Sequence, residues 1–384
     1  AEFIRFAEGK RAILIVEEGQ PEYIEQAVNT ILRRADIQTK VHGKDMLPMA
    51  GEYTGQVMKE GFGKFVRSYH PALAGASGSP PGDNRLKAAQ AALDGNVHGR
   101  PPSFCTGCPE RPIFTAMKLV ERELGQHHVS CDIGCHLFSI LPPFNIGATT
   151  MGYGLGGAGA SAFNVKGPDK PSKRPIAIMG DGGFWHNGLA SSVGNAAFNK
   201  SDGVIIVVDN GYSAATGGQD ILSSHHPNER RSTQNKIETA VRGVGVDWVR
   251  TLTRTYDLKA MTATLREALT TPAPGPKVIV AQSECMLNRQ RREKPLRDKA
   301  IQRGERIVRD RFGVDADTCT GDHSCIRLSG CPSLTVAPHP DPLRREPVTK
   351  VINSCVGCGL CGEVAHAAKL CPSFYKASIV NNPT

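Results

Sequence analysis

The chain contains 384 residues, 40% of them hydrophobic, and its formal net charge is +9 at pH 7. This length predicts two or three domains with a real hydrophobic core. No apolar run approaches the roughly 18 residues that a membrane helix needs, which excludes an integral helical membrane protein. The chain begins with neither an initiator Met nor a secretory signal. We therefore expect a soluble, cytoplasmic protein whose first residue lies inside a larger polypeptide.

The first region alternates short strands with an amphipathic helix. We expect strands at residues 12–18 and 39–44, with a helix at 22–34 between them. These elements predict a small α/β domain over residues 1–70. Residues 71–103 are rich in Pro, Gly and Ser, which favours a linker.

A larger alternation extends over residues 104–287. The predicted helices are 112–124, 187–199 and 258–270, and the predicted apolar strands are 175–180, 204–210 and 277–285. Continuous apolar strands separated by helices are typical of a parallel, doubly wound sheet of the α/β class. Such sheets bind ligands at the carboxyl ends of their strands.

The last third of the chain changes character twice. Residues 288–312 are densely charged and partly helical in pattern. They fit either a solvated connector or a docking surface for another subunit or electron carrier. Residues 313–384 form a cysteine-rich segment with an internal repeat.

The most informative stretch joins two predicted strand ends. One strand ends at Gly180-Asp181-Gly182, and 27 residues separate Gly182 from Asn210 at the end of the next. Parallel strands bring the Asp181 carboxylate and the Asn210 amide to one edge, where hard oxygen ligands suit Mg²⁺. The glycines allow backbone N–H groups to approach phosphates. The spacing predicts a magnesium–diphosphate site, with a structural pair of turns as the alternative.

His186 follows Asp181 by five residues and is expected just before the next helix. A solvent-facing or capping histidine is the default interpretation. Because His186 is close to the predicted cofactor edge, substrate contact or proton transfer is the competing one. We retain His186 as a candidate catalytic residue.

Twelve cysteines in a chain without a secretory signal favour metal or redox use over disulfides. Cys105 and Cys108 form a CxxC pair. Cys135 follows 27 positions after Cys108, and Cys285 ends the last predicted strand. Only a folded domain could bring these four together.

The cysteine-rich segment resembles a two-cluster bacterial ferredoxin, in which the Cys before each Pro ligates the cluster of the other repeat. The pattern implies one cluster on Cys331, Cys355, Cys358 and Cys361. It implies another on Cys319, Cys325 and Cys371, with Asp322 in the place of the fourth thiolate. Carboxylate is harder than thiolate, so Asp322 either ligates iron that is readily lost or stays unbound beside a [3Fe–4S] cluster.

Four stretches together resemble the 2-oxoacid:ferredoxin oxidoreductases: "SFCTGCPERPIF", "CDIGCHLFSILPPF", the strand-end motif with "TGGQ", and "SECML". Within that group they are similar to the large-subunit family of the indolepyruvate ferredoxin oxidoreductases. The resemblance covers nearly the whole chain. It implies a transketolase-C-like domain over residues 1–70, a thiamine-diphosphate domain over 104–287 and a ferredoxin-like domain over 313–384.

The resemblance also assigns site residues. Asp181 and Asn210 would bind Mg²⁺ together with the carbonyl of Tyr212, and Thr216 would lie beside thiamine diphosphate. A proximal [4Fe–4S] cluster would be held by Cys105, Cys108, Cys135 and Cys285. Cys131 is then left over as a buried structural thiol.

The resemblance implies oxidative decarboxylation of a 2-oxo acid, with the acyl group passed to coenzyme A and electrons passed to ferredoxin. An aryl pyruvate such as indolepyruvate is expected; pyruvate, 2-oxoglutarate and branched-chain 2-oxo acids are alternatives. A non-oxidative thiamine enzyme or a pure electron-transfer subunit would account for only one of the two kinds of site.

The resemblance implies several partners as well. A pyrimidine-binding region would precede residue 1, and a smaller gamma-type subunit and ferredoxin would join a dimer of heterodimers. With three clusters bound the net charge would fall to roughly +4, so no nucleic-acid partner is expected.

Overall fold

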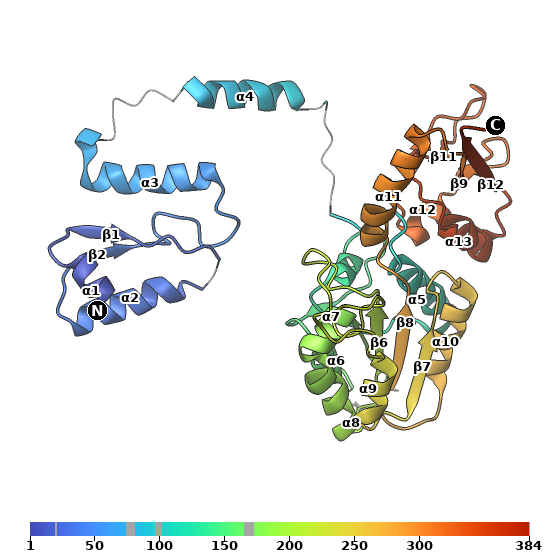
Figure 1. The fold of residues 1–384 in the computed structure, drawn as a ribbon, viewed down its shortest axis with the longest axis horizontal. Helices are drawn as coiled ribbons and strands as arrows, with labels where there is room; N and C mark the ends of the chain where they lie inside the picture. The colour runs from blue at the N-terminus through green and yellow to red at the C-terminus, as the bar shows by residue number, and fades with distance from the viewer. Residues whose placement is uncertain (20, 74–80, 95, 97–101, 165–172, 384) are drawn as a thin grey trace. The chain divides into compact units, whose positions relative to one another are not determined.

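A computed structural model describes residues 1–19, 21–73, 81–94, 96, 102–164 and 173–383 (Figure 1). The chain divides into two compact units, Ala1–Arg100 and Pro101–Thr384. Among the described residues, no helix has both the length and the apolar character needed to span a bilayer.

The first unit is built on a two-stranded parallel sheet. β1 (Ala12–Leu14) pairs with β2 (Lys40–His42). The helices α1 (Glu2–Ala7) and α2 (Tyr23–Arg34) pack together, and α2 also packs against β2. Their small buried core consists of Ala7, Ile13, Val28 and Leu32. The strands and the helix expected in this region are confirmed.

Further helices follow in the same unit. They are α3 (Gly55–Tyr69), the short 3-10 helix η1 (Pro71–Leu73) and α4 (Pro81–Leu93). α4 lies inside the segment 71–103 that composition predicted as a linker. Its Leu86 and Leu93 are exposed. α4 begins at Pro81, and proline is common at the first position of a helix. The high Pro and Gly content of the segment favoured a linker and did not reveal this local signal.

The second unit is organised around a six-stranded sheet in which every pairing is parallel. Its strands, in spatial order, are β4 (Thr149–Thr150), β3 (Val129–Cys131), β5 (Ile176–Gly180), β6 (Val204–Asp209), β8 (Lys277–Gln282) and β7 (Trp248–Leu252). The predicted parallel α/β sheet is confirmed. β3, β4 and β7 were not predicted. β3 and β4 are only two or three residues long and carry no periodic pattern, and β7 includes the polar residues Arg250 and Thr251, so it is not a continuous apolar run.

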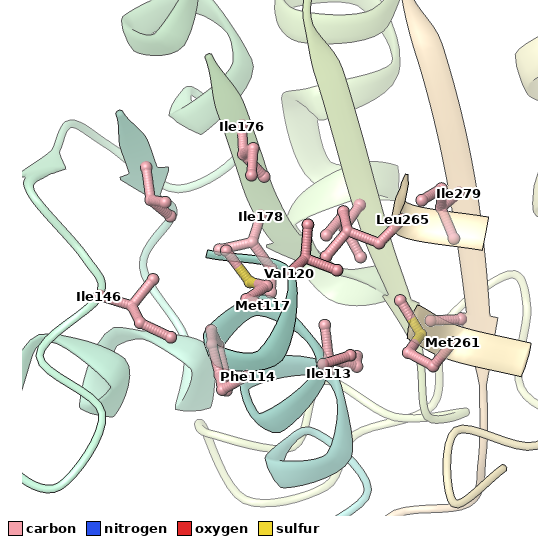
Figure 2. Packing of buried hydrophobic residues seen from close by; sticks show 14 of the residues in the cluster. Ile113, Phe114, Met117, Val120, Ile146, Ile176, Ile178, Met261, Leu265 and Ile279 are labelled. Atoms are coloured by element: carbon pink, nitrogen blue, oxygen red, sulfur yellow. The ribbon is translucent and has the colours of Figure 1, made fainter. Parts of the chain in front are cut away.

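Helices cover both faces of this sheet. On one face, α5 (Arg111–Leu124) and α10 (Leu258–Thr270) pack against alternate strand residues such as Ile176 and Ile178. Figure 2 shows Met117 and Val120 of α5 lying against Ile178. On the other face, Ala177, Met179 and their neighbours pack against α9 (Ile237–Gly243) and the helical run after β5. Burial on both faces explains why these strands are continuously apolar.

The helical run after β5 consists of α7 (Asp181–Gly183), the π-helix η3 (Phe184–Gly194) and α8 (Asn195–Phe198), with α6 (Gly156–Ser161) beside it. It begins at Asp181, earlier than the helix predicted at 187–199. Glycine has low helix propensity, so the run Gly182-Gly183 gave no local helix signal. Packing of the helical run against the sheet therefore sets its first residue.

The remaining elements carry most of the cysteines and belong to the same compact unit as the sheet (orange to red in Figure 1). α11 (Met286–Gln302) leads into β9 (Ile307–Val314), which pairs antiparallel with β12 (Phe374–Asn381). β10 (Leu334–Ala337) pairs antiparallel with β11 (Val348–Val351). α12 (Ser324–Ser329) and α13 (Leu360–Lys369) pack together and against α5.

The connector predicted at 288–312 is therefore mostly α11, and its last residues lie in β9. Its charged composition suits a helix with a solvated face, because α11 buries few residues. The ferredoxin-like fold of residues 313–384 stays a prediction.

Candidate active site

Four neighbouring strands end at one edge of the sheet, and a candidate site residue follows each of them. Cys135 comes after β3, Asp181 after β5, Asn210 after β6 and Cys285 after β8. Parallel strands point the same way, so their carboxyl ends share an edge. The topology thus gathers residues that are far apart in the sequence.

Backbone groups hold the two predicted magnesium ligands in place. The Oδ1 of Asp181 accepts a hydrogen bond from the N–H of Gly182 at 2.8 Å, and its Oδ2 accepts one from Gly211 at 2.7 Å. Gly211 has a φ of +82°, which glycine adopts without strain. The Oδ1 of Asn210 accepts from the N–H of Tyr212 at 3.3 Å. Both ligand side chains are buried.

A second buried carboxylate lies close to Asp181. Burial raises the pKa of Asp181 well above its ordinary value, and the charge of Asp209 raises it further. Asp209 Oδ1 makes no hydrogen bond and lies 3.5 Å from Nε2 of the half-exposed His225. A divalent cation on Asp181 would offset this unfavourable concentration of negative charge. The residues present therefore fit magnesium.

One cavity at this edge brings together all the residues predicted to bind thiamine diphosphate, which are Gly180, Asp181, Gly182, Asn210, Tyr212 and Thr216. Cys135 and Tyr153 also line it. A Cβ at Gly182 would collide with the Tyr153 hydroxyl and lie 2.9 Å from Ser213 Oγ. A side chain at Gly182 would therefore have to displace Tyr153 or Ser213 from the cavity wall. The individual ligand roles stay predictions.

Two buried titratable residues in this cavity were missed by sequence reasoning. Glu110 and His136 line it, and His136 Nδ1 lies 3.9 Å from Glu110 Oε2. Burial raises the pKa of Glu110 to about 8 and lowers the pKa of His136 to about 4, so both are uncharged at neutral pH. Glu110 Oε2 and both ring nitrogens of His136 have no hydrogen-bond partner. Such buried polar atoms fit a polar ligand in the cavity.

The positions of these two residues next to cysteine motifs were a usable signal. Glu110 follows the CxxC pair by two residues, and His136 directly follows Cys135. The sequence did not show that Glu110 and His136, rather than other residues next to these cysteines, would line the cavity.

His186 lies elsewhere. It sits inside η3, not before the helix as predicted, and its side chain is exposed and absent from the cavity lining. Its ring centroid is 5.2 Å from that of Tyr153, which does line the cavity. A role of His186 in catalysis stays a prediction and would act through Tyr153.

The first cysteine set gathers beside this cavity. Burial raises the pKa of the Cys135 thiol, and the charges of Glu110, Cys285 and Cys105 raise it further. Burial raises the pKa of the Cys108 thiol as well, and the charge of Cys135 raises it further. Cys135 is thus close enough to each of the other three cysteines predicted to hold the proximal cluster for their charges to interact. The N–H of Cys285 also donates to Asn210 O at 3.1 Å, which ties this set to the magnesium edge.

The structure brings cysteines of the two C-terminal repeats together, and their assignment to two clusters stays a prediction. Burial raises the pKa of the Cys361 thiol, and Cys331, Cys358 and Cys355 raise it further. Burial also raises the pKa of the Cys325 thiol, and Cys319 and Cys371 raise it to a smaller extent. Each set combines cysteines from both repeats.

Asp322 lines one cavity together with Cys319, Cys325 and Cys371. Its Oδ1 accepts a hydrogen bond from the N–H of Ser324 at 2.8 Å, near the start of α12. The carboxylate is therefore in the predicted place, and iron ligation by Asp322 stays a prediction.

Among the described residues, no three His, Cys, Asp or Glu side chains are close enough to hold a single metal ion. An iron–sulfur cluster is larger and needs thiolates spaced around it, which the three sets provide. Burial raises the pKa of some of these thiols, among them Cys108, Cys135 and Cys361, so metal binding there would release protons. The donor sets therefore fit iron–sulfur clusters. Cys131 is fully buried 3.3 Å from Ser139 Oγ, as expected for a structural thiol.

Comparison with known proteins agrees with this site. Residues 132–281 match the model of the thiamine pyrophosphate enzyme, C-terminal TPP binding domain. The chain is 29% identical over 376 residues to indolepyruvate oxidoreductase subunit IorA of Pyrococcus abyssi, covering 94% of this chain and 52% of the relative. The chain is therefore similar to IorA subunits over nearly its whole length. The resemblance inferred from its motifs is confirmed.

Other comparisons extend this result. IorA of Methanothermobacter thermautotrophicus is 26% identical over 383 residues, covering 96% of this chain and 53% of the relative. The chain therefore spans about half the length of the curated relatives it matches. A solved structure of a 2-oxoglutarate:ferredoxin oxidoreductase from Magnetococcus marinus aligns with a TM-score of 0.40 and 20% identity, over 49% of this chain and 66% of that one. A likeness at that level carries no weight for the fold.

Proposed function

We propose that this chain supplies the diphosphate-binding and electron-transfer part of a 2-oxoacid:ferredoxin oxidoreductase that forms an acyl-CoA and releases CO2. The observation that carries this proposal is the shared sheet edge. There, the predicted magnesium ligands and the first cysteine set are joined by the hydrogen bond from Cys285 to Asn210. A non-oxidative thiamine enzyme has no need of such cysteines, and an electron-transfer subunit has no need of the diphosphate cavity.

When bound, thiamine diphosphate supplies a nucleophilic carbon and an electron sink for removing the carboxylate of a 2-oxo acid, and iron–sulfur clusters carry electrons singly. Asp181, Asn210 and the Tyr212 carbonyl would hold Mg²⁺ and through it the diphosphate. Gly180, Gly182 and Thr216 would shape the wall around the diphosphate.

Three further residues of the cavity would shape the surroundings of the bound groups. Glu110 and His136 are uncharged at neutral pH, so they can donate and accept hydrogen bonds without adding charge next to the anionic diphosphate. Tyr153 is held by Ser213, whose Oγ lies 3.0 Å from the Tyr153 hydroxyl. These three residues would orient the bound groups and limit the entry of water.

Three cluster sites would continue from this cavity. The first would use Cys105, Cys108, Cys135 and Cys285. The second would use Cys331, Cys355, Cys358 and Cys361. The third would use Cys319, Cys325, Cys371 and Asp322.

We further propose an aryl pyruvate such as indolepyruvate as the substrate, because the relatives are named for indolepyruvate. Pyruvate, 2-oxoglutarate and branched-chain 2-oxo acids are the alternatives. The proposed partners are a pyrimidine-binding region, a gamma-type second subunit and ferredoxin, in a cytoplasmic dimer of heterodimers. The proposed domains are residues 1–70, 104–287 and 313–384, with a linker at 71–103 and a connector at 288–312.

An anaerobic assay of the complete complex tests the function. It would supply indolepyruvate, phenylpyruvate, pyruvate or 2-oxoglutarate, with and without coenzyme A, and follow viologen reduction. CoA-dependent reduction that is strongest with aryl pyruvates is expected. Strongest reduction with pyruvate or 2-oxoglutarate would overturn the substrate but keep the reaction, and CO2 release without dye reduction would overturn the electron path.

An Asp181→Ala variant provides the matched control. It should keep its clusters, measured by iron content and absorbance, and lose nearly all turnover. Full turnover in this variant would contradict the diphosphate role of the site.

A further inference from the structure

Arg111 is a charged side chain with no exposed surface. It begins α5, directly after Glu110, and its relative exposure is 0%. Burying an unpaired guanidinium is strongly unfavourable, so its charge needs a compensating anion. Yet within the part of the chain that the structure describes, no Asp or Glu forms an ion pair with it. Another source of negative charge is required.

The contacts of Arg111 lead to cysteines. Its Nη1 donates to Ser329 O at 2.9 Å, and its Nη2 lies 3.9 Å from Cys358 Sγ. Burial alone would lower the pKa of Arg111, but Cys331, Cys358 and Cys108 outweigh this and raise it. Ser329 stands two residues before Cys331. Once these cysteines are ionised as cluster ligands, the compensating charge would therefore come from the second set and, from the other side, from the first.

Arg111 lies where the loops of these two sets meet. Gly107, inside the Cys105–Cys108 turn, packs so closely that a Cβ would lie 2.5 Å from Val356 Cγ2, inside the Cys355–Cys358 turn. The Oγ1 of Thr106 is also 3.2 Å from Ser333 Oγ, which is 2.8 Å from Ser354 Oγ. The second set is therefore the neighbour of the first.

We propose that Arg111 is a positioning residue for electron transfer, whose buried positive charge raises the reduction potential of the cluster on the second set. This inference rests on the proposed function, because it takes the cysteine sets as cluster ligands. A cation beside a cluster stabilises the added electron, since net charge and hydrogen bonds to sulfur set the potential.

The electron balance is simple. One electron leaves the first cluster and enters the second, from which it passes to the third, and Arg111 is neither oxidised nor reduced. Arg111 makes its sulfur contact with Cys358, so its effect is larger on the second cluster than on the first. It thereby favours movement of the electron away from the thiamine cavity.

Potentiometric EPR titration of the anaerobically purified holoprotein tests the proposal. Arg111→Gln removes the charge but keeps hydrogen-bonding capacity, and Arg111→Lys keeps the charge. The expected result is a lower potential of the second cluster in Arg111→Gln, a smaller shift in Arg111→Lys, and an unchanged third cluster as the internal reference. Equal potentials in the unmodified protein and Arg111→Gln would overturn the proposal, as would equal shifts in both variants.

A second measurement tests the proposal even if Arg111→Gln does not assemble its clusters. In unmodified protein labelled with ¹⁵N-arginine, pulsed EPR of the reduced second cluster should detect a weak guanidinium ¹⁵N coupling that is lost in Arg111→Lys. No coupling in the unmodified protein would overturn the proposal. Absence of iron from the unmodified protein would instead overturn the proposed function, and the inference with it.

Discussion

At the residue scale, the cavity wall contains a histidine that the sequence pattern did not single out. His136 is buried in the wall with both ring nitrogens free of hydrogen bonds, whereas His186 is exposed outside it. We expect His136→Ala to reduce 2-oxo-acid-dependent viologen reduction by about 100-fold, because a buried polar group that lines the cavity is lost. His186→Ala should change it by less than about threefold, as for other exposed positions. The reverse order would restore His186 as the catalytic residue.

Asp322 allows a second test at the same scale. Replacing the carboxylate by a softer thiolate in Asp322→Cys should make the third cluster retain its fourth iron on exposure to air, measured by iron content and EPR. Asp317→Cys is the matched control, because Asp317 is exposed nearby and does not line the Asp322 cavity. Iron content and spectra that do not change in Asp322→Cys would contradict a ligand role for Asp322.

At the element scale, the turn before α5 has to pass close to the turn before α13. Gly107 and Gly275 both have a φ of +72°, but only Gly107 has neighbours where a Cβ would be built. Gly275→Ala should therefore cost about 1 kcal/mol of unfolding free energy from backbone strain alone. Gly107→Ala should cost a further 1–3 kcal/mol or so through overpacking, and release iron from the first and second sets. Thermal unfolding and iron content measure both effects, and equal losses in the two variants would refute close packing of the turns.

The start of β8 buries a lysine that depends on one carboxylate. Lys277 has no exposed surface, and its Nζ donates to Asp202 and to Gly275 O at 2.8 Å. Burial alone would raise the pKa of Asp202, but hydrogen bonds from Lys277 and Arg174 outweigh it and hold the pKa below its usual range. The carboxylate therefore stabilises the fold above its unfolded pKa, and this stabilisation is lost as the pH falls through the lower folded value.

Asp202→Asn should lower the unfolding free energy at pH 7 by roughly 2 kcal/mol. That is less than for a fully buried pair, because Asp202 is partly exposed. The difference from the unmodified protein should close below about pH 4, measured by denaturant unfolding across pH. Asp247→Asn, at an exposed aspartate, should have no effect at either pH. A difference independent of pH would show that the charge of Asp202 is not the cause.

At the scale of the whole molecule, all twelve cysteines lie in the unit Pro101–Thr384, and the unit Ala1–Arg100 has none. Cluster binding should therefore stabilise only the second unit. An iron chelator should lower the midpoint temperature of one unfolding transition by several degrees or more and leave the other unchanged, as measured by anaerobic calorimetry with and without the chelator. A common shift of both transitions would mean that the two units unfold together.

The grouping of the C-terminal cysteines could be predicted from the sequence, because repeat spacing and the Cys-Pro pairs are local features, whereas the first set was predicted from the family resemblance; both memberships stay predictions. The magnesium edge was also predictable, since apolar strands that end in Asp181 and Asn210 leave little freedom in a parallel sheet. The neutral pair Glu110–His136 was not predictable, because its pKa values arise from burial among segments that meet only in the fold.

The sequence by itself determined the parallel α/β class, the strand-end motif and the cysteine repeat of the C-terminal segment, because periodicity and spacing are properties of neighbouring residues. Only the tertiary structure decided that His136 lines the cavity while His186 is exposed outside it, and that the second cysteine set adjoins the first across Arg111. These features depend on which surfaces pack against each other, and packing joins residues whose separation along the chain carries no pattern.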